Sequence, residues 1–221
     1  MISRCGREHP FDAIFAPRTA LVVIDMQNYF VSPGYMGHVP MAKTVVPNIN
    51  RLAMALRQRG GHVVWVRNTT AGTERNWSVL NDCLLSPENS KKRFESMVEG
   101  HDGFEFCYGL DIQDADAKIV KTKYSAFLQG SSRLNEHLLG RGIDTVLIAG
   151  TATNVCCESS ARDAMMLNFK TVMIDDCLAA YSDQEHEASL SAFYAMFGDV
   201  QVSHETIAFF DSAAAQGALI P

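Results

Sequence analysis

Six short runs of apolar, largely β-branched residues recur along the chain, and most are separated by stretches long enough to form a helix. The runs span residues 20–25, 62–67, 118–121, 145–149, 170–175 and 200–202. Strands that are apolar along their whole length and alternate with helices are typical of a parallel sheet covered on both faces. The pattern therefore predicts an α/β fold, a three-layer α/β/α sandwich around a central parallel sheet of about six strands.

The stretches between these runs carry helical signals of their own. Between residues 43 and 59, apolar side chains recur every three or four positions, and Gly60 follows as a stop. The recurring side chains are Val45, Ile49, Leu52 and Leu56. Two later stretches, which end before Gly140 and Gly198, show a similar pattern, so we expect helices to cover the predicted sheet.

Composition excludes several classes of protein. The chain has 221 residues and a net charge of −6, so it has no overall basic charge that would attract nucleic acid. No apolar run is long enough to cross a membrane.

No repeat, linker or charge run divides the chain, and we expect one domain over residues 1–221. The first residues lack the apolar stretch of a signal peptide, so we expect a cytoplasmic protein whose six cysteines are reduced.

The stretch from Thr69 to Asp116 departs from the alternating pattern. It is long, polar and weakly periodic, and it contains several glycines. Segments of this length in compact domains are commonly functional lids or binding loops. A helix followed by surface coil fits the same composition equally well, and the sequence favours neither interpretation.

Three reactive side chains fall at the carboxyl ends of predicted strands, where parallel α/β sheets bind their ligands. Asp25 ends the first strand, Lys121 ends the third, and Cys156 follows the fourth. Each alone has a common structural explanation, as a turn former, a solvated lysine or an inert buried thiol. Their convergence on one edge of the sheet favours a catalytic site. Lys123 and Cys157 are competing positions that spacing alone does not exclude.

The surroundings of the thiol indicate nucleophilic chemistry. Gly150 and two threonines lead from the fourth strand toward a predicted helix, which places Cys156 in the first helical turn. Unpaired N–H groups and the helix dipole favour an anion there, and a nearby lysine strengthens the effect. We therefore expect the pKa of the thiol to lie below its usual value of about 8.5. The same N–H groups suit the oxyanion that forms when a carbonyl is attacked.

Three motifs at these strand ends resemble those of the isochorismatase-like cysteine hydrolase superfamily. They are VVIDMQN at residues 22–28, KTKYSAF at residues 121–127 and GTATNVCCESSARDA at residues 150–164. The third motif is the most specific, and the order and spacing of all three match over residues 17–210. The resemblance implies a hydrolase that acts on a small-molecule substrate, with no nucleic-acid or membrane partner, and that forms a homo-oligomer, either a dimer or a tetramer.

The resemblance also assigns roles to individual residues. It implies a catalytic triad of Asp25, Lys121 and Cys156, and it selects the lysine that begins the second motif and the first of the paired cysteines. It places a cis peptide bond between Ala152 and Thr153, next to N–H groups that would hold an oxyanion. For the triad to meet, we expect the first, third and fourth strands to be neighbours, as in a flavodoxin-like order.

The implied reaction is hydrolysis of a carbon–nitrogen bond through a thioester. Asp25 would take the thiol proton, and Lys121 would stabilise the thiolate that attacks an amide or ureido carbonyl. Asp25 would then protonate the leaving ammonia or amine. Water, activated by Asp25, would release the acyl group.

Within the superfamily, the motifs are most similar to those of ureidoacrylate and N-carbamoyl amidohydrolases, which release ammonia from ureido or carbamoyl acids. Cys156 argues against the isochorismate-cleaving branch, and residues 67–70 lack the Asp-x-His metal motif of nicotinamidases. We therefore expect no metal and no cofactor. The candidate substrate-binding residues are Gln27, Asn68, Trp77 and Tyr124.

Alternatives of other kinds stay open. The fold is also compatible with hydrolysis of another amide or ester, of the maleamate, biuret or nicotinamide type, or with a non-catalytic role. A redox function of Cys156 and Cys157 ranks lower, because adjacent cysteines form only a strained ring and no Cys-x-x-Cys motif is present. A substrate carboxylate would require an arginine. The sequence does not rank the candidates, which are Arg67, Arg75, Arg93 and Arg162.

Overall fold

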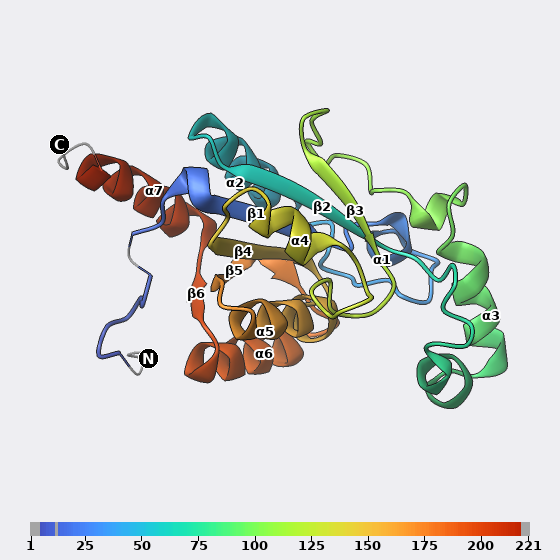
Figure 1. The fold of residues 1–221 in the computed structure, drawn as a ribbon. Helices are drawn as coiled ribbons and strands as arrows, with labels where there is room; N and C mark the ends of the chain where they lie inside the picture. The colour runs from blue at the N-terminus through green and yellow to red at the C-terminus, as the bar shows by residue number, and fades with distance from the viewer. Residues whose placement is uncertain (1–4, 12, 218–221) are drawn as a thin grey trace.

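The computed structural model describes residues 5–11 and 13–217, and the other residues of the predicted 1–221 domain lie outside the described part. Six parallel strands form one sheet in the order β3-β2-β1-β4-β5-β6 (Figure 1). The strands are β1 (Thr19–Ile24), β2 (His62–Asn68), β3 (Ala117–Lys121), β4 (Thr145–Thr151), β5 (Lys170–Ala179) and β6 (Asp199–Gln201). Each predicted run overlaps one of these strands, and the predicted fold class is confirmed.

Helices connect most of the strands and cover both faces of the sheet. Figure 1 shows α2 above the sheet and α5 and α6 below it. The α-helices are α1 (Asn28–Val31), α2 (Val46–Gln58), α3 (Pro87–Ser96), α4 (Leu134–Leu139), α5 (Glu158–Met166), α6 (Asp183–Met196) and α7 (Ser203–Gly217). Shorter helical segments are η1 (Ala16–Arg18), η2 (Val79–Leu84), η3 (Asp102–Phe104) and η4 (Thr153–Cys157).

Alternate residues of the strands pack into two separate apolar layers. On β1, Leu21 and Val23 belong to the layer that contains the buried side of α2, whereas Val22 and Ile24 belong to the layer that contains α5 and α6. All four side chains are fully buried. Because helices cover both faces, such a strand is apolar at every position, which explains why its sequence does not alternate with polar residues.

The strand order differs from the flavodoxin-like order that we expected. The first and third strands are not neighbours, because β2 lies between β1 and β3. The chain proceeds outward from β1 through β2 to β3, and it then restarts on the other side of β1 with β4. The carboxyl ends of β1 and β4 therefore flank the point where the winding direction reverses, which is where sheets of this kind bind ligands.

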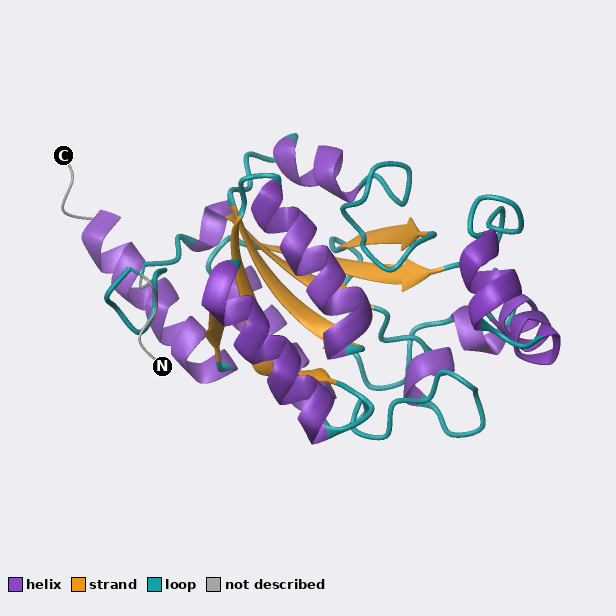
Figure 2. Ribbon diagram, turned by 90° about the horizontal axis from the view of Figure 1, so that it is seen from below, coloured by secondary structure: helices purple, strands orange, loops and turns teal. Residues whose placement is uncertain are grey.

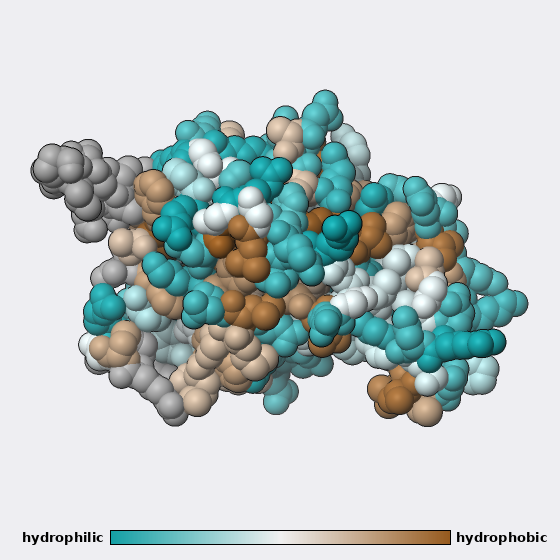
Figure 3. Space-filling view, in the orientation of Figure 1, coloured by the Kyte–Doolittle hydropathy of each residue, from teal (hydrophilic) through white to brown (hydrophobic). Residues whose placement is uncertain are grey.

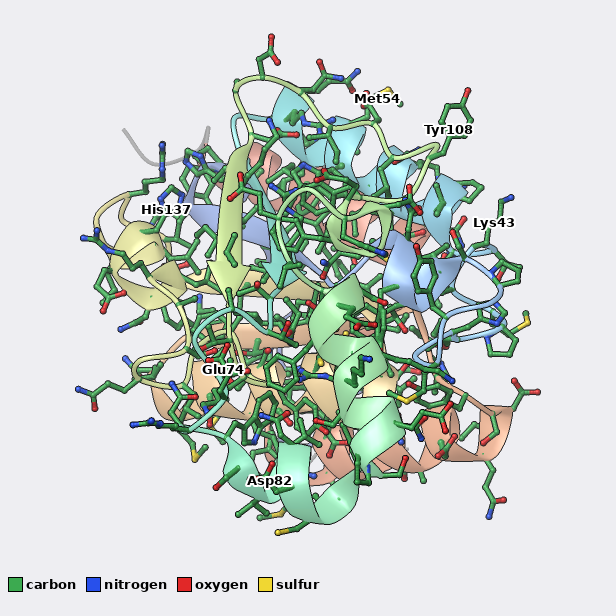
Figure 4. All side chains as sticks on the ribbon, turned by 90° about the vertical axis from the view of Figure 1, so that its right-hand side faces the viewer. Lys43, Met54, Glu74, Asp82, Tyr108 and His137 are labelled. Atoms are coloured by element: carbon green, nitrogen blue, oxygen red, sulfur yellow. The ribbon has the colours of Figure 1, made fainter. Side chains whose placement is uncertain are left out.

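Residues 69–116 combine both forms that the sequence left open. The segment contains η2, α3 and η3, which lie beyond the carboxyl ends of the strands, at the right of Figures 1 and 2, and its last residues lead back to the start of β3. Figure 4 looks directly at this end of the molecule, where Glu74 marks the loop before η2 and Asp82 marks η2 itself. We call residues 69–116 the capping segment, because their helices cover the end of the sheet.

The visible surface is mainly hydrophilic, and its apolar patches are small and separate (Figure 3). The most exposed large apolar side chain in the described part is Tyr108, which is 98% exposed and points away from the fold in Figure 4. No helix within residues 5–11 and 13–217 is both long and apolar enough to cross a membrane.

Gly150 provides a test of how tightly β1 and β4 are packed. Its φ is +114°, and a Cβ atom built there would lie 2.0 Å from the carbonyl oxygen of Ile24. We expect Gly150→Ala to lower the free energy of unfolding by about 4 kcal/mol or more, since the neighbouring backbone cannot yield cheaply. Gly130 also has a positive φ, of +79°, but nothing lies within 4 Å of its Cβ position. Gly130→Ala should therefore lower the free energy of unfolding by only about 1–2 kcal/mol. Urea unfolding of both variants measures the difference. Equal losses of stability in the two would contradict the packing argument.

Candidate active site

Asp25 occupies the first position after β1, and its backbone is unusual. The φ of Asp25 is 54°, a left-handed conformation that residues with a Cβ atom rarely adopt. Its N–H donates to the carbonyl oxygen of Val66 on β2 at 2.9 Å, which fixes the turn. Such conformations occur where the surrounding structure imposes them, and they are common at active sites. The carboxylate is completely buried at the end of the sheet.

Lys121 reaches Asp25 across the end of an intervening strand. Parallel strands lie about 4.8 Å apart, so β3 and β1 are separated by about twice that distance. The long side chain spans this gap, and its Nζ lies 2.8 Å from Oδ2 of Asp25, with both side chains fully buried. Nζ also donates to the carbonyl oxygen of Lys123 at 3.0 Å. The length of lysine explains why the expected adjacency of the first and third strands is unnecessary.

Lys123, the competing lysine, takes a different position. Its Nζ donates to the carbonyl oxygen of Asn76 at 2.7 Å, at the surface of the capping segment. It does not join the buried pair. The geometry thus brings Lys121, and not Lys123, to Asp25.

Cys156 lies in η4, the helical segment that leads from β4 into α5. Cys156 is 4% exposed and faces a cavity, and the charges of Asp25 and Lys121 act on its thiol. The neighbouring Cys157 is fully buried, and its Sγ lies 3.9 Å from the carbonyl oxygen of Ala149 within the sheet layer. The two thiols therefore point to different surroundings, and only Cys156 of this pair lines the cavity.

The expected lowering of the Cys156 pKa is wrong for the resting protein. Burial raises the pKa of the thiol, Lys121 lowers it and the negative charge of Asp25 raises it further. The sequence argument considered the helix terminus and the lysine, but it had no measure of desolvation, which is the largest effect. Cys156 is consequently a neutral thiol beside a buried ion pair.

The two charged partners have raised pKa values for different reasons. Burial raises the pKa of Asp25, and Lys121 offsets part of that shift. Burial opposes the charged form of Lys121, but the Asp25 carboxylate and the Cys156 sulfur beside it together raise the pKa of the amine. Asp25 is therefore suited to accept a proton, whereas Lys121 remains a fixed positive charge.

The cis peptide bond lies one residue earlier than expected. It joins Thr151 to Ala152, not Ala152 to Thr153. The reason is that β4 continues to Thr151, which still pairs with Ala179 of β5, while Thr153 already begins η4. Ala152 is the single residue between the two elements, and it lines the cavity beside Cys156.

Serine side chains join the lysine motif to the cysteine motif. Ser160 Oγ accepts from the N–H of Ala126 at 3.0 Å and donates to the carbonyl oxygen of Cys156 at 2.7 Å. Ser125 Oγ accepts from the N–H groups of Phe127 and Leu128 and so folds the loop after β3. Ser160 thereby connects the loop after Lys121 to the backbone of Cys156.

A second network holds η4 from the opposite side. Thr153 Oγ1 lies 2.9 Å from Nδ1 of His186 on α6, and Nε2 of His186 lies 2.7 Å from Oδ1 of Asp175. Thr153 is fully buried, so its hydroxyl group fixes the start of the segment that carries Cys156. Thr153 was predicted near the oxyanion site, whereas His186 and Asp175 gave no signal in the sequence because only the tertiary fold brings them to this segment.

Gln27 is a structural clamp and does not line the cavity. Its Nε2 donates to the carbonyl oxygens of Asn68 and Phe104, and its Oε1 accepts from the N–H of Asn68 at 2.6 Å. These bonds tie the ends of β1 and β2 to the segment at η3. The amide of Gln27 thus bonds to backbone groups, and the residue does not line the cavity, contrary to our expectation.

The cavity above Cys156 has a volume of about 260 Å³. Asn68 and Tyr124, two of the four predicted contacts, line it. Trp77 does not; it packs edge-on against Tyr124, with ring centroids 4.8 Å apart, and supports that ring from behind. The full lining is Tyr29, Phe30, Met36, Gly37, Asn68, Leu80, Leu85, Arg93, Tyr124, Ala152, Val155, Cys156 and Tyr181.

Several lining residues were not predicted individually. Tyr29 and Tyr181 come from outside the three motifs, and neither has a sequence pattern that distinguishes it from a packing residue. Arg93 was one of four unranked arginines, and the structure places it in the cavity. Within the described part of the chain, no cluster of three or more histidine, cysteine, aspartate or glutamate side chains has a geometry that would hold a metal ion.

Comparisons with known proteins show the family to which the chain belongs. Residues 19–205 match the isochorismatase domain family. A probable inactive nicotinamidase of Arabidopsis thaliana is 35% identical over 174 residues, which cover 78% of this chain and 86% of that protein. The ureidoacrylate amidohydrolase RutB of Acinetobacter baylyi is 31% identical over 197 residues, covering 82% and 79%. The crystal structure of a cysteine hydrolase from Pseudomonas syringae pv. phaseolicola is 27% identical, with a TM-score of 0.81 over 90% of this chain and 95% of that one.

The two lysines of the second motif provide a matched test of the buried pair. Lys121→Met leaves the Asp25 carboxylate buried without a partner, and we expect it to lower the free energy of unfolding by about 3–5 kcal/mol. Lys123→Met removes a surface interaction and should change stability by no more than about 1 kcal/mol. Denaturant unfolding of both proteins measures the difference, and similar losses in the two would contradict the assignment of the buried partner.

Proposed function

The chain belongs to the isochorismatase family and is a hydrolase of the amidohydrolase type, and we propose that it cleaves a carbon–nitrogen bond of a small ureido or carbamoyl acid and releases ammonia. The observation that carries the proposal is the buried ion pair of Asp25 and Lys121, whose charges act on the thiol of Cys156, the member of the set that lines the cavity. This set combines a nucleophile, a base and a fixed positive charge.

The first half of the reaction begins from a neutral thiol. Because burial raises the pKa of Cys156, the thiol does not ionise by itself at neutral pH, and Asp25 takes its proton as the sulfur attacks the carbonyl carbon. Lys121 stabilises the negative charge on sulfur as it develops. The carbonyl oxygen becomes an oxyanion, which the backbone N–H groups near Thr153 and Cys156 hold.

The second half regenerates the enzyme. The tetrahedral intermediate collapses with loss of nitrogen, and the proton held by Asp25 passes to the leaving ammonia. Sulfur then carries an acyl group as a thioester, which is a thiocarbamate when the substrate is a ureido compound. Asp25 next takes a proton from water, and the resulting hydroxide attacks the acyl carbon. The thiolate leaves and recovers that proton.

The substrate class rests on the size of the cavity and on a relative. A cavity of about 260 Å³ is smaller than the 300–1,000 Å³ typical of sites for drug-sized ligands, which favours a small metabolite. The A. baylyi relative that is 31% identical acts, by its name, on ureidoacrylate. Asn68 and Tyr124 provide polar side chains beside Cys156 that suit a planar ureido group.

Ammonia release from a panel of compounds tests the proposal. The panel contains 3-ureidoacrylate, 3-ureidopropionate, N-carbamoyl amino acids, maleamate, biuret and nicotinamide, each with and without a chelator. We expect one ureido or carbamoyl acid to be hydrolysed at a rate that the chelator does not change. Cys156→Ala should lower kcat by at least about 10⁴-fold, since it removes the nucleophile.

Cys157→Ala is the matched control, because it removes the adjacent thiol that does not line the cavity. It should retain kcat within about tenfold, as the loss concerns packing alone. Full activity of Cys156→Ala would refute the covalent mechanism. Hydrolysis confined to maleamate, biuret or nicotinamide would move the substrate to another amide class, and silence across the panel would favour a non-catalytic role.

A further inference from the structure

Arg93 is an uncommon residue to find in an apolar cavity. It lies in α3, within the capping segment, and it is 7% exposed while lining the same cavity as Cys156. Taking a guanidinium group out of water costs several kcal/mol unless an anion or a set of acceptors compensates it. The role of Arg93 therefore depends on whether groups of the protein itself stabilise its buried guanidinium.

The protein itself provides little compensation. The Nη1 of Arg93 donates to Oδ1 of Asn81 at 3.4 Å, which is a long bond, and the guanidinium lies 5.4 Å from the centre of the Trp77 ring. Within the described residues, no carboxylate lies within ion-pair distance of Arg93. Asp25, whose charge also acts on Arg93, is already paired with Lys121.

Other arginines of the chain show what a structural role looks like. Arg67 pairs with Glu105 at 3.0 Å, and Arg57 pairs with Asp111 at 2.9 Å. Arg162 pairs with Glu158. These three have acidic partners and are at least partly exposed, whereas Arg93 is more deeply buried and lacks such a partner in the described part.

The charges around the cavity are unbalanced. Asp25 and Lys121 neutralise each other, and Cys156 is a neutral thiol, so Arg93 leaves one positive charge at the site. None of the described residues that line the cavity is acidic. A ligand with a single negative charge would restore neutrality in a region of low dielectric, where the interaction is strong.

Two further polar atoms in the cavity lack partners within the described structure. The hydroxyl of Tyr29 and the Oδ1 atom of Asn68 are buried without a hydrogen bond, and both residues line the cavity. Burial raises the pKa of Tyr29 to about 12, so its hydroxyl stays protonated and can donate. Asn68 Oδ1 is an acceptor and suits an N–H group. Buried polar groups are normally hydrogen-bonded, so these two atoms are available to a ligand.

We propose that Arg93 binds the carboxylate of the substrate, with Tyr29 donating a second hydrogen bond to it and Asn68 accepting from a ureido N–H. The guanidinium matches a carboxylate through two parallel hydrogen bonds, which gives orientation as well as affinity. The inference rests on the proposed function and specifies its substrate class as a monoanionic ureido acid rather than a neutral amide. It also gives the capping segment a role in specificity.

Binding to Cys156→Ala tests the anionic subsite without requiring turnover. Calorimetry would compare 3-ureidopropionate with propylurea, in which a methyl group replaces the carboxylate, and with propionate, which lacks the ureido group. We expect 3-ureidopropionate to bind about 100-fold more tightly than propylurea, and Arg93→Met to abolish that preference. Arg93→Lys should retain part of it, because lysine keeps the charge but not the paired geometry.

The matched control is Arg67→Met, which removes a half-buried arginine that does not line the cavity and should leave the preference unchanged. Arg93→Gln provides a second neutral variant in case Arg93→Met is poorly folded, and thermal unfolding monitors both. A preference that survives in both neutral variants, or no preference for the carboxylate in Cys156→Ala, would overturn the inference.

Kinetics separates failure of this inference from failure of the proposed function. If 3-ureidoacrylate is hydrolysed but Arg93→Met changes kcat/KM for it by less than about threefold, the reaction stands and the subsite is wrong. If no compound of the panel is hydrolysed while Cys156→Ala still binds 3-ureidopropionate through Arg93, the anionic subsite stands and the proposed reaction fails. Tight binding of propionate alone would show that the subsite recognises any small carboxylate, and the ureido contact of Asn68 would then be wrong.

Discussion

The buried ion pair between Asp25 and Lys121 is the interaction on which the site depends. Two charged groups without exposure to water are tolerated because Nζ of Lys121 lies 2.8 Å from Oδ2 of Asp25 and also donates to the carbonyl oxygen of Lys123. The pair fixes the ends of β1 and β3 relative to each other across β2, and Gln27 ties the same region to η3. Cys156 is then added from the opposite side of β1 by η4. The arrangement thus closes the end of the sheet around the topological reversal.

Burial controls the chemistry of this site more than any single contact does. It raises the pKa of Asp25 and of the Cys156 thiol. The thiol is therefore protonated before the reaction, and the neighbouring carboxylate can accept its proton. Proton transfer and carbon–sulfur bond formation can therefore proceed together. The same exclusion of water strengthens the interaction of Arg93 with an anion. The capping segment contributes Leu80, Leu85 and Arg93 to the wall of the cavity.

The motifs predicted that Asp25, Lys121 and Cys156 would meet at one edge of the sheet, because each lies at or just after the end of a strand and its neighbours are restricted by local folding. The VVID run ends at the turn of Asp25, and the GTATNVCC run places Cys156 at the start of a helix. Substrate contacts were harder to predict. Gln27 is polar and lies beside the site in sequence, yet its amide bonds to backbone groups and does not line the cavity. Arg93 lies in a weakly periodic segment, where nothing in the sequence distinguishes a buried arginine from an exposed one.

The sequence by itself determined the three-layer parallel fold, the strand positions and the three reactive residues. It could do so because strands buried on both faces require continuous apolar runs, and because the motif residues lie at the ends of those runs. Tertiary structure alone decided the strand order, the reach of Lys121 across β2, the raised pKa of the thiol and the selection of Arg93 among four arginines. These features depend on distances and on exclusion of water between segments far apart in the chain, which local patterns do not encode.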